Sequence, residues 1–316
     1  MTNDVLVLFE HPEWQKPLFA ALEKRGVRYA TLDLKAGAFV AGDAPDARVV
    51  FNQASPSAYV RGNTRAVPLA LAYLKALEAS GRRVLNGHRA FALELSKTAQ
   101  AALLGRLGIR TPRSIAFNDL DALRACLERE RSWRWPVLLK PEQGGSGARI
   151  TKLGSYDELR AHVESTRGIW EPDGLLLAQE YFEHDHEHGI VRMELLGGEL
   201  LYAMRVVSHG RYNLCPSEVC NPTDGEGHCE IPAEKPAPPV EFHSFKEVPA
   251  DAVLAAKKIV EAGGIDVGGI EYLESRGERV FYDVNANSNL RAPIALEWGF
   301  DPFERVAEWL SGAARP

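Results

Sequence analysis

The chain has 316 residues, of which 45% are hydrophobic and 25% are charged, and its formal net charge is −6. Such values are typical of a globular protein with two domains or a few fused lobes. The acidic balance offers no basic surface for nucleic acid, and no apolar run reaches the roughly 18–20 residues of a membrane helix. Four cysteines give no disulfide framework, so we expect a cytoplasmic protein that binds neither nucleic acid nor membranes.

Strands and helices alternate over the first part of the chain. Short apolar runs predict strands at residues 5–9, 28–32, 48–52 and 83–86, and periodic apolar runs predict helices at residues 14–25 and 67–79. Alternation of this kind predicts a parallel sheet covered by helices. We therefore expect an N-terminal α/β domain over residues 1–87.

The remaining chain divides into a central part, residues 88–177, and a C-terminal part, residues 178–316. In the central part we expect helices at residues 90–107, 119–130 and 156–165 and strands at residues 135–140, 148–153 and 175–181. In the C-terminal part we expect strands at residues 190–196, 199–207, 265–273 and 279–284 and helices at residues 251–262 and 302–310. The pair Gly197-Gly198 predicts a hairpin turn, and the composition of residues 215–248 predicts a long loop.

A glycine-rich turn follows the strand that ends at Lys140. Gly144, Gly145, Ser146 and Gly147 would let backbone N–H groups approach an anion closely, and Lys140 adds a positive charge. The segment lacks the Gly-Lys-Ser/Thr of a P-loop, and no helix opens after the glycines as in a dinucleotide-binding fingerprint. It therefore indicates either a phosphate site of another kind or an ordinary hairpin turn.

Oxygen-bearing side chains end two strands near the C-terminus. Asp283 and Asn285 are two residues apart on an apolar strand, so their side chains point to the same face. Glu271 ends what we expect to be the neighbouring strand. Hard oxygen ligands with this spacing suit a Mg²⁺ ion that also holds phosphates, so the pattern indicates a metal–nucleotide site.

Other polar residues have two interpretations each when they are taken alone. Lys97 lies on a predicted helix, where a solvated lysine is the alternative to a ligand contact. Gln179 and Glu180 end an apolar strand, which would either leave the core there or bind an adenine edge. Arg192 and Arg205 lie on consecutive strands, where they would bind phosphate or carboxylate groups or form exposed salt bridges.

The order and spacing of these residues, from about residue 90 to residue 290, resemble the ATP-grasp superfamily. The nearest likeness is to the RimK-type α-L-glutamate ligases and the glutathione-synthetase-like enzymes. The segment 264–271 resembles that group's strand ending in a metal-binding acid, and the segment 283–288 resembles its Glu-Val-Asn-x-x-Pro signature. The resemblance implies an ATP-grasp fold that is α/β overall and α+β in its C-terminal part, with a Rossmann-like N-terminal domain and a central lid subdomain.

The resemblance also implies ATP and Mg²⁺ as cofactors, with Mn²⁺ as an alternative, and a role for each matched residue. Lys97 and Lys140 would bind the α- and β-phosphates, and the turn at residues 144–147 would close over the γ-phosphate. Gln179, Glu180 and Tyr181 would line the adenine pocket, Arg211 and Asn213 would lie near the nucleotide and the reaction centre, Glu271, Asp283 and Asn285 would hold the metal, and Arg205 would face the transferred phosphoryl group. The predicted catalytic residues are therefore Lys140, Arg205 and Asn213.

Three places depart from the family pattern. Asp283 replaces the usual Glu and Glu271 replaces the usual Asp, so that the two changes in length offset each other. Ile190 stands where such ligases carry the Asp that binds the ribose, and Asp185 or Glu187 would substitute for it. Asn287-Ser288-Asn289 replaces the common Ser-Pro-Gly, which leaves the choice of substrate open.

Cysteines and histidines cluster in two places. Cys215, Cys220, His228 and Cys229 lie in the long loop, where they would bind zinc or an iron–sulfur cluster or form a reduced, partly buried loop. The tight Cys-x₂-Cys knuckle of most zinc sites is absent there, which favours the reduced loop. Three histidines alternate over residues 184–188; they would share one face of a strand and bind metal, or lie in a solvated turn.

Together these residues predict an ATP-dependent carboxylate–amine ligase. ATP would convert a carboxylate into an acyl phosphate, and an amine would then displace phosphate to form an amide or peptide bond. This chemistry needs positioning and charge neutralisation rather than a protein nucleophile, which agrees with a site made of cations, glycines and metal ligands.

We expect an α-L-glutamate-ligase-like enzyme with small-molecule or peptide carboxylate and amine substrates. One alternative is a small-molecule or dipeptide ligase of amino-acid or natural-product synthesis. The other alternative is a non-catalytic nucleotide-binding regulatory protein, which should have lost at least one of the three oxygen ligands. A homo-oligomer, a dimer or a tetramer, is a further expectation that the resemblance implies.

Overall fold

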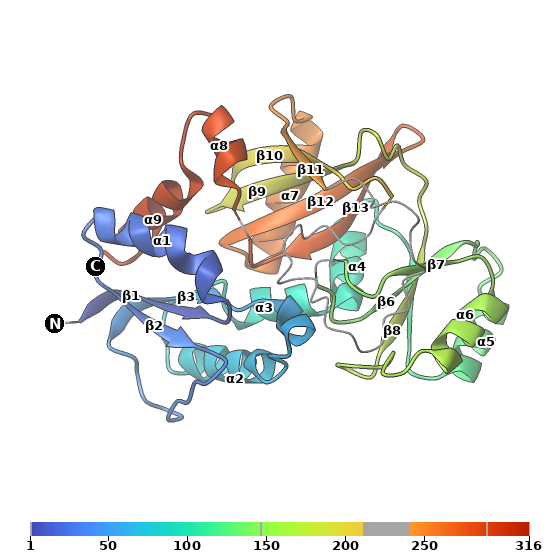
Figure 1. The fold of residues 1–316 in the computed structure, drawn as a ribbon, viewed down its shortest axis with the longest axis horizontal. Helices are drawn as coiled ribbons and strands as arrows, with labels where there is room; N and C mark the ends of the chain where they lie inside the picture. Colours follow the sequence, from blue (N-terminus) through green and yellow to red (C-terminus); the bar gives the residue numbers. More distant parts are fainter. Residues whose placement is uncertain (1, 146, 211–239, 289, 316) are drawn as a thin grey trace.

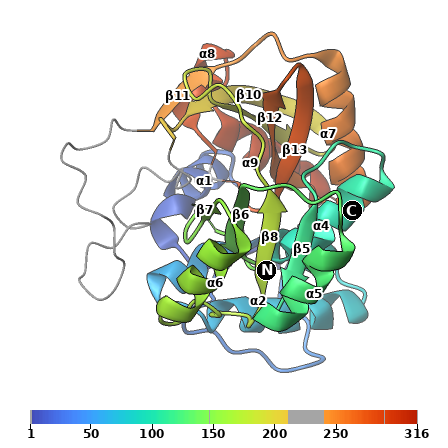
Figure 2. The ribbon, with the colours of Figure 1, turned by 90° about the vertical axis from the view of Figure 1, so that its right-hand side faces the viewer.

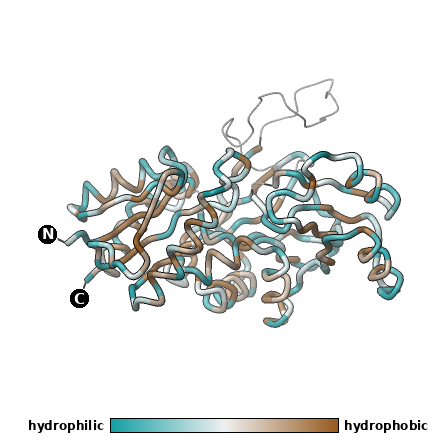
Figure 3. The backbone as a smooth tube through the Cα atoms, turned by 90° about the horizontal axis from the view of Figure 1, so that it is seen from below, coloured by the Kyte–Doolittle hydropathy of each residue, from teal (hydrophilic) through white to brown (hydrophobic). Residues whose placement is uncertain are grey.

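The protein is described by a computed structural model that covers residues 2–145, 147–210, 240–288 and 290–315. Three sheets follow one another along the chain and each carries its own helices (Figure 1). Hydrophobic segments gather along the strands and on the inner sides of the helices, whereas the loops at the surface are mostly hydrophilic (Figure 3). None of the described helices has both the length and the apolar character that a membrane span requires.

The first sheet is parallel and forms the N-terminal α/β unit. Its strands are β1 (Asn3–Phe9), β2 (Tyr29–Asp33), β3 (Ala47–Gln53) and β4 (Val84–Leu85), in the order β2-β1-β3-β4. Helices α1 (Pro12–Lys24) and α9 (Pro302–Ala313) cover one face, and α2 (Ala66–Ala79) covers the other. Because both faces are covered, β1 and β3 are almost continuously buried.

The second sheet is antiparallel and forms a separate lobe with two helices (Figure 2). It consists of β5 (Ser114–Phe117), β6 (Val137–Pro141), β7 (Thr151–Leu153) and β8 (Leu176–Glu180), in the order β5-β8-β6-β7, with α5 (Leu120–Arg129) and α6 (Tyr156–Ser165). Each helix begins at a side-chain cap: Asp119 accepts from the Ala122 N–H at 2.8 Å and Ser155 accepts from the Glu158 N–H at 3.2 Å.

The third sheet is antiparallel and has five strands. They are β9 (Ile190–Leu196), β10 (Glu199–Val207), β11 (Glu241–Ser244), β12 (Val267–Ser275) and β13 (Glu278–Asn285), in the order β11-β10-β9-β12-β13, with α7 (Ala250–Gly263) against one face and the short helix α8 (Ala292–Glu297) after the last strand. The predicted turn between β9 and β10 is confirmed, because Gly197 and Gly198 both have positive φ angles, 58° and 84°.

The helix predicted over residues 90–107 is in fact two helices, α3 (His88–Leu95) and α4 (Lys97–Arg106). Ser96 adopts an extended conformation between them, and its Oγ accepts from the Ala99 N–H at 3.0 Å. Glu142, from the loop after β6, accepts from the N–H and the hydroxyl group of Thr98, at 3.1 and 2.8 Å. A side chain 44 residues away in sequence therefore stabilises the start of α4, and Lys97 lies in the first turn of that helix.

Some helices pack against a sheet from another part of the chain. Helices α3 and α4 pack with α7 on the third sheet, where Ala90, Leu104 and Ile259 share one core. Helix α9 returns from the end of the chain to the first sheet, where Val306 and Leu310 pack with β1 and β3. The division at residues 87 and 177 thus follows the order of the chain, whereas the packed units around the first and third sheets include helices from outside those ranges.

Asn86 joins the first unit to the third sheet. It follows β4 with a positive φ of 51° and its side chain is fully buried. Its Nδ2 donates to the carbonyl groups of Val267 and Ala286, at 2.8 and 2.5 Å, and its Oδ1 accepts from the N–H groups of Asp266 and Val267, at 2.8 and 3.0 Å. All the hydrogen-bonding capacity of this amide is therefore used to hold two sheets together.

Candidate active site

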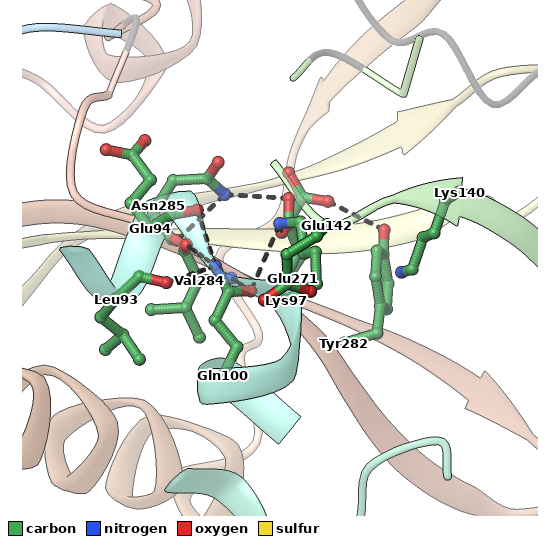
Figure 4. A network of polar contacts seen from close by, with 12 residues as sticks. Leu93, Glu94, Lys97, Gln100, Lys140, Glu142, Glu271, Tyr282, Val284 and Asn285 are labelled. Atoms are coloured by element: carbon green, nitrogen blue, oxygen red, sulfur yellow. Dashed lines mark hydrogen bonds and ion pairs between the residues drawn. The ribbon is translucent and has the colours of Figure 1, made fainter. Parts of the chain in front are cut away.

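A cavity of about 260 Å³ lies where the three units meet. The first unit contributes Ser55, Pro56 and Ser57 to its wall, and the second lobe contributes Lys140, the glycine turn and the end of β8. The third sheet contributes one face of β9, β10, β12 and β13. Figure 4 shows Lys97 and Glu271 at the centre of a polar network, with Lys140 and Tyr282 on one side and Glu94 and Asn285 on the other.

The three predicted metal ligands lie together in this cavity. Glu271 on β12 is directly opposite Asp283 on β13, and Asn285 follows two residues on. The Asn285 Nδ2 donates to Asp283 Oδ2 at 3.2 Å and to the Gly269 carbonyl group at 3.4 Å. Among the described residues the Asn285 Oδ1 has no hydrogen-bond donor, so this oxygen can serve as a metal ligand. The three side chains thus present oxygen atoms at one end of the cavity.

A β-bulge in β13 shapes this end of the cavity. The pairing with β12 shifts between Glu271 and Tyr272, so that Tyr282 is the extra residue. Tyr282 and Asp283 therefore both line the cavity, although consecutive strand residues ordinarily point to opposite faces. The Tyr282 hydroxyl group donates to Glu271 Oε2 at 2.9 Å and fixes the orientation of that carboxylate.

Lys97 and Lys140 both reach the cavity from different units. The Lys97 ammonium group forms an ion pair with Asp283 and donates to Gln100 Oε1 at 3.3 Å. The buried Lys140 ammonium group donates to Gln179 Oε1 at 2.6 Å. Burial, and then the nearby Lys97 charge, lower the pKa of Lys140 to about 8, so the free site favours the arrival of an anion.

The carboxylates at the metal end have opposite pKa shifts. Burial and the neighbouring Asp283 charge raise the pKa of Glu271. Burial also opposes the ionised form of Asp283, but the Lys97 ammonium group outweighs it and lowers the pKa of Asp283. A cation is therefore already attracted to these acids, and two carboxylates with an amide oxygen match the ligands that Mg²⁺ and Mn²⁺ prefer.

The glycines of the predicted turn are required by close packing as well as by flexibility. A Cβ atom on Gly144 would lie 2.5 Å from the Lys97 Cε atom, a distance at which one of the two groups must move. The turn also touches the first unit, since Gln143 Nε2 donates to the Pro56 carbonyl group at 2.9 Å. Gly144, Gly145 and Gly147 all line the cavity, so the turn lies beside both lysines.

Arg192, and not Arg205, enters the cavity from the third sheet. Arg192 donates to Glu194 Oε1 at 2.6 Å and to Glu271 Oε1 at 2.8 Å. Arg205 does not line the cavity; its guanidinium group lies over the Phe245 ring at 4.4 Å, and Phe245 packs on the core beneath α7. Strand alternation explains the position of Arg205, because Met204 and Val206 face the cavity and Arg205, between them, faces away.

The residues predicted for the adenine and ribose contacts are only partly together. Gln179, Glu180 and Tyr181 line the cavity at the end of β8, but the Gln179 carboxamide holds Lys140 and the Glu180 side chain accepts from the Arg113 N–H at 3.0 Å. Glu187 is exposed and does not line the cavity. The ribose assignment to Glu187 therefore has no support from its position.

The three histidines of residues 184–188 do not act as one set: two line the cavity and the third is exposed. His184 and His186 line the cavity, with their rings in an edge-to-face arrangement at 4.5 Å. His188 is exposed and pairs with Asp185. Within the part of the chain that the structure describes, no group of three His, Cys, Asp or Glu side chains is placed to hold a metal ion. The predicted set at Glu271 differs because its third oxygen comes from an amide.

Several predicted residues lie outside the described ranges. These are Ser146 of the glycine turn, Arg211 and Asn213 near the expected reaction centre, and the cluster Cys215, Cys220, His228 and Cys229. The roles assigned to them remain predictions.

Two charged residues that line the cavity were missed by the sequence analysis. Glu94 on α3 is 3% exposed; its Oε1 accepts from the Asn287 N–H at 3.1 Å and its Oε2 has no partner in the described structure. Burial raises the pKa of Glu94 to about 8. Arg291, at the start of α8, is the second. Neither belongs to a recognisable motif. The only signal for Glu94 was a charged residue within a helical apolar pattern, and Arg291 precedes a helix too short for such a pattern.

Comparisons with known proteins place this site in context. No family model matches the chain. The "Coenzyme gamma-F420-2:alpha-L-glutamate ligase" of Methanocaldococcus jannaschii is 27% identical over 138 residues, which are 43% of this chain and 46% of that protein. The alignment thus spans about half of that curated relative.

Solved structures are similar over nearly the whole chain. The RimK domain ATP-grasp protein of Sphaerobacter thermophilus has a TM-score of 0.69 at 16% identity, and the match covers 97% of this chain and 98% of that one. The VanG D-Ala:D-Ser ligase of Enterococcus faecalis has a TM-score of 0.68 at 16% identity over the full length of both chains. The ATP-grasp ligase PsnB in complex with its minimal precursor has a TM-score of 0.65 at 18% identity, covering 99% and 100% of the two chains.

Proposed function

Because this chain has the ATP-grasp fold, we propose that it is an ATP-dependent ligase that joins a carboxylate to an amine through an acyl phosphate. The observation that carries this proposal is one cavity holding Lys97, Lys140 and three oxygen donors, with a glycine turn beside them. These groups extend in sequence from Lys97 to Asn285, and phosphate binding beside a divalent cation needs this combination of charges.

We assign the nucleotide contacts from the position of each group. Lys97 and Lys140 would bind phosphate oxygens, and the backbone N–H groups of the glycine turn would add further donors. Glu271, Asp283 and Asn285 would hold Mg²⁺, which when bound would neutralise charge on the phosphates. Lys97 would then exchange its contact with Asp283 for a phosphate oxygen.

Arg192 takes the role that the sequence analysis gave to Arg205. It contacts Glu271 and lines the same cavity, so its guanidinium group lies next to the expected phosphoryl transfer. The close approach is allowed by Gly269, where a Cβ atom would lie 2.5 Å from Arg192 Nη2. Its two carboxylate partners hold the guanidinium group in place before substrate arrives, which is the preorganisation that charge stabilisation requires.

The proposed reaction has two balanced steps. A carboxylate oxygen of the first substrate attacks the γ-phosphorus atom, and the bond from that atom to the β,γ-bridging oxygen breaks to give ADP and an acyl phosphate. The nitrogen of the second substrate then attacks the acyl carbon, the bond from that carbon to the phosphate oxygen breaks, and the amine loses a proton. The products are an amide, ADP and phosphate, and no protein atom forms a covalent bond.

The curated relative favours an α-L-glutamate ligase among the substrate classes. VanG is a ligase of two amino acids, D-Ala and D-Ser, and the D-cycloserine synthetase DcsG has a TM-score of 0.68 at 15% identity. We propose the glutamate class first, with small-molecule or dipeptide ligation as the alternative. The cytoplasmic location and the homo-oligomeric state stay predictions.

The test is a screen of phosphate release from Mg-ATP with pairs of amino acids and short peptides. Hydroxylamine in place of the amine would trap an acyl phosphate as a hydroxamate. We expect both signals from the natural chain and neither from Asp283→Ala. Asp251→Ala, an exposed acid paired with Arg279 at the start of α7, is the matched control and should keep both. Phosphate release that gives no hydroxamate with any carboxylate would contradict the acyl phosphate.

A further inference from the structure

Arg291 lies where two cavities meet. It lines the cavity that holds the proposed nucleotide site and also a second cavity of about 380 Å³ between α1, α9 and the segment before α8. The walls of the second cavity include Trp14, Phe51 and Phe303, so they are largely apolar. A molecule that enters from the reaction centre therefore meets a guanidinium group before it reaches an apolar space.

The charge of Arg291 is not balanced within the part of the chain that the structure describes. No described carboxylate lies within 4.0 Å of its guanidinium group, and the nearby Glu194 is already bonded to Arg192 and Ser288. Burial, and then repulsion by Arg192, lower the pKa of Arg291 to about 10. A half-buried cation in this position gains free energy when an anion binds beside it.

The guanidinium group is also held in a defined orientation. It lies over the Phe242 ring, 3.2 Å from the ring centroid, and the Arg291 backbone N–H donates to the Tyr202 hydroxyl group at 2.7 Å. Stacking on a ring covers one face and leaves the N–H groups at the edge of the plane for other partners. These groups suit a planar carboxylate, which guanidinium binds with two parallel hydrogen bonds.

Arg291 is separate from the groups that would hold the triphosphate. Its guanidinium group lies over Phe242 on β11, at one edge of the third sheet, whereas Glu271 and Asp283 lie on β12 and β13 toward the other edge. A carboxylate bound to Arg291 would therefore lie away from the phosphate to be transferred. It would be a carboxylate that remains unchanged in the reaction.

We propose that Arg291 binds a non-reacting carboxylate of a substrate, so that at least one substrate is an amino acid or peptide with a free carboxylate. The identification of that molecule as a substrate rests on the proposed ligase activity, but the binding itself does not. The carboxylate could belong to the amine or to the acyl donor, and the experiment separates these two sources.

The first measurement is binding without chemistry. Wild-type protein with Mg²⁺ and a non-hydrolysable ATP analogue is titrated with the L-amino acids and glutamyl dipeptides, and with the α-carboxamide of each. We expect at least one free acid to bind about 10- to 100-fold more tightly than its amide, as for a hydrogen-bonded charge. Arg291→Met should remove that preference, and Arg291→Lys should keep part of it.

The matched control is Arg305→Met. Arg305 also lies over a phenylalanine ring, that of Phe300 at 5.6 Å, but it is on α9 and lines neither cavity. The Arg305→Met protein should bind the free acids and their amides as the wild type does. Equal binding of every acid and its amide by wild-type protein, or an unchanged preference in a folded Arg291→Met protein, would overturn the inference.

Turnover then separates the inference from the proposed function. With a productive pair, Arg291→Met should raise the KM for the free-acid substrate about 10- to 100-fold, with kcat within a few fold and the KM for ATP unchanged. Amidating one substrate at a time shows whether the amine or the acyl donor carries the carboxylate. A binding preference without any phosphate release would contradict the ligase proposal while leaving the Arg291 site intact.

Discussion

The two faces of the third sheet are built from the same strands but have opposite character. On one face Val191, Met193 and Ile270 are fully buried beneath α7. On the other face Arg192 and Glu271, which alternate with them, line the active-site cavity. The apolar face needs only shape and volume, whereas the charged face is stable because its buried charges are paired with one another.

This contrast shows how one set of strands divides stability from function. Arg192 is bonded to both Glu194 and Glu271, so removing Arg192 leaves two buried carboxylates without their cation. Removing a methyl group from the other face leaves a cavity but no charge. Substitutions on the charged face should therefore change turnover, whereas substitutions on the apolar face should change the free energy of unfolding.

The largest effect is expected at Lys140, across the cavity from the charged face. Lys140→Ala removes a buried cation from the proposed phosphate site, and ligand-dependent ADP release should fall by about 10²- to 10³-fold or to background. Lys257→Ala, on α7 at the apolar side and paired with Glu199, is the control and should retain normal turnover. Undiminished ADP release in Lys140→Ala would exclude the lysine from catalysis.

On the apolar face, Ile270→Ala should lower the free energy of unfolding by about 2–5 kcal/mol, because it opens a cavity beneath α7. Chemical denaturation measures this value. Leu254→Ala, on the exposed side of α7 at 59% exposure, should change it by less than about 0.5 kcal/mol. A large loss of kcat in the folded fraction of Ile270→Ala would show that the two faces are not independent.

The two arginines of β9 and β10 provide a direct comparison of the faces. Arg192→Lys keeps a charge near Glu271 but cannot bridge Glu194 and Glu271 as the planar guanidinium group does, so we expect kcat to fall about 10- to 100-fold. Arg205→Lys, on the α7 side, should leave kcat within about twofold, since that side chain contacts Phe245 and not the cavity. The reverse ranking in steady-state kinetics would restore the catalytic role first predicted for Arg205.

The smallest effect is a pH-dependent stability at Glu94. Its pKa is about 8 in the folded protein and near 4.5 when unfolded. Its contribution to the free energy of unfolding is therefore complete below pH 4.5 and is lost as the pH rises through 8. Glu94→Gln removes this dependence. Between pH 5 and pH 9 the free energy of unfolding of the variant, relative to that of the wild type, should rise by more than about 1.4 kcal/mol, which is the value of one pKa unit. If denaturation curves give the same difference in free energy of unfolding between variant and wild type at pH 5 and at pH 9, the raised pKa of Glu94 is contradicted.

Most of the regular structure could be predicted because the signals are local. The strands at residues 190–196 and 199–207 and the helix at residues 156–165 have the predicted bounds, since each combines a clear period with a turn or a cap. Four short elements were missed: the 3₁₀ helix η1 (Pro56–Arg61), β5, β11 and α8. They contain only four to six residues each, which is too few for a periodic pattern.

The parts of the site that could not be predicted depend on distant contacts. The break at Ser96 is stabilised by Glu142, which no local pattern around Lys97 reveals. The choice between Arg192 and Arg205 depends on which strand face meets the lobe that carries Lys140, and that is a tertiary property. The grouping of Asp283 and Asn285 on one strand face was predicted because strand alternation is local, whereas the bulge that turns Tyr282 toward Glu271 is not.

Asn86 limits how this molecule can open. Its single amide group closes four hydrogen bonds between the end of the first sheet and the strands that carry Glu271 and Asn285, and α9 provides a second crossing between the same two units. With two separate attachments, the wall at Ser55 and the wall at Asn287 should keep their spacing. We therefore expect any opening of the cavity to come from rotation of the antiparallel lobe, because neither attachment includes it.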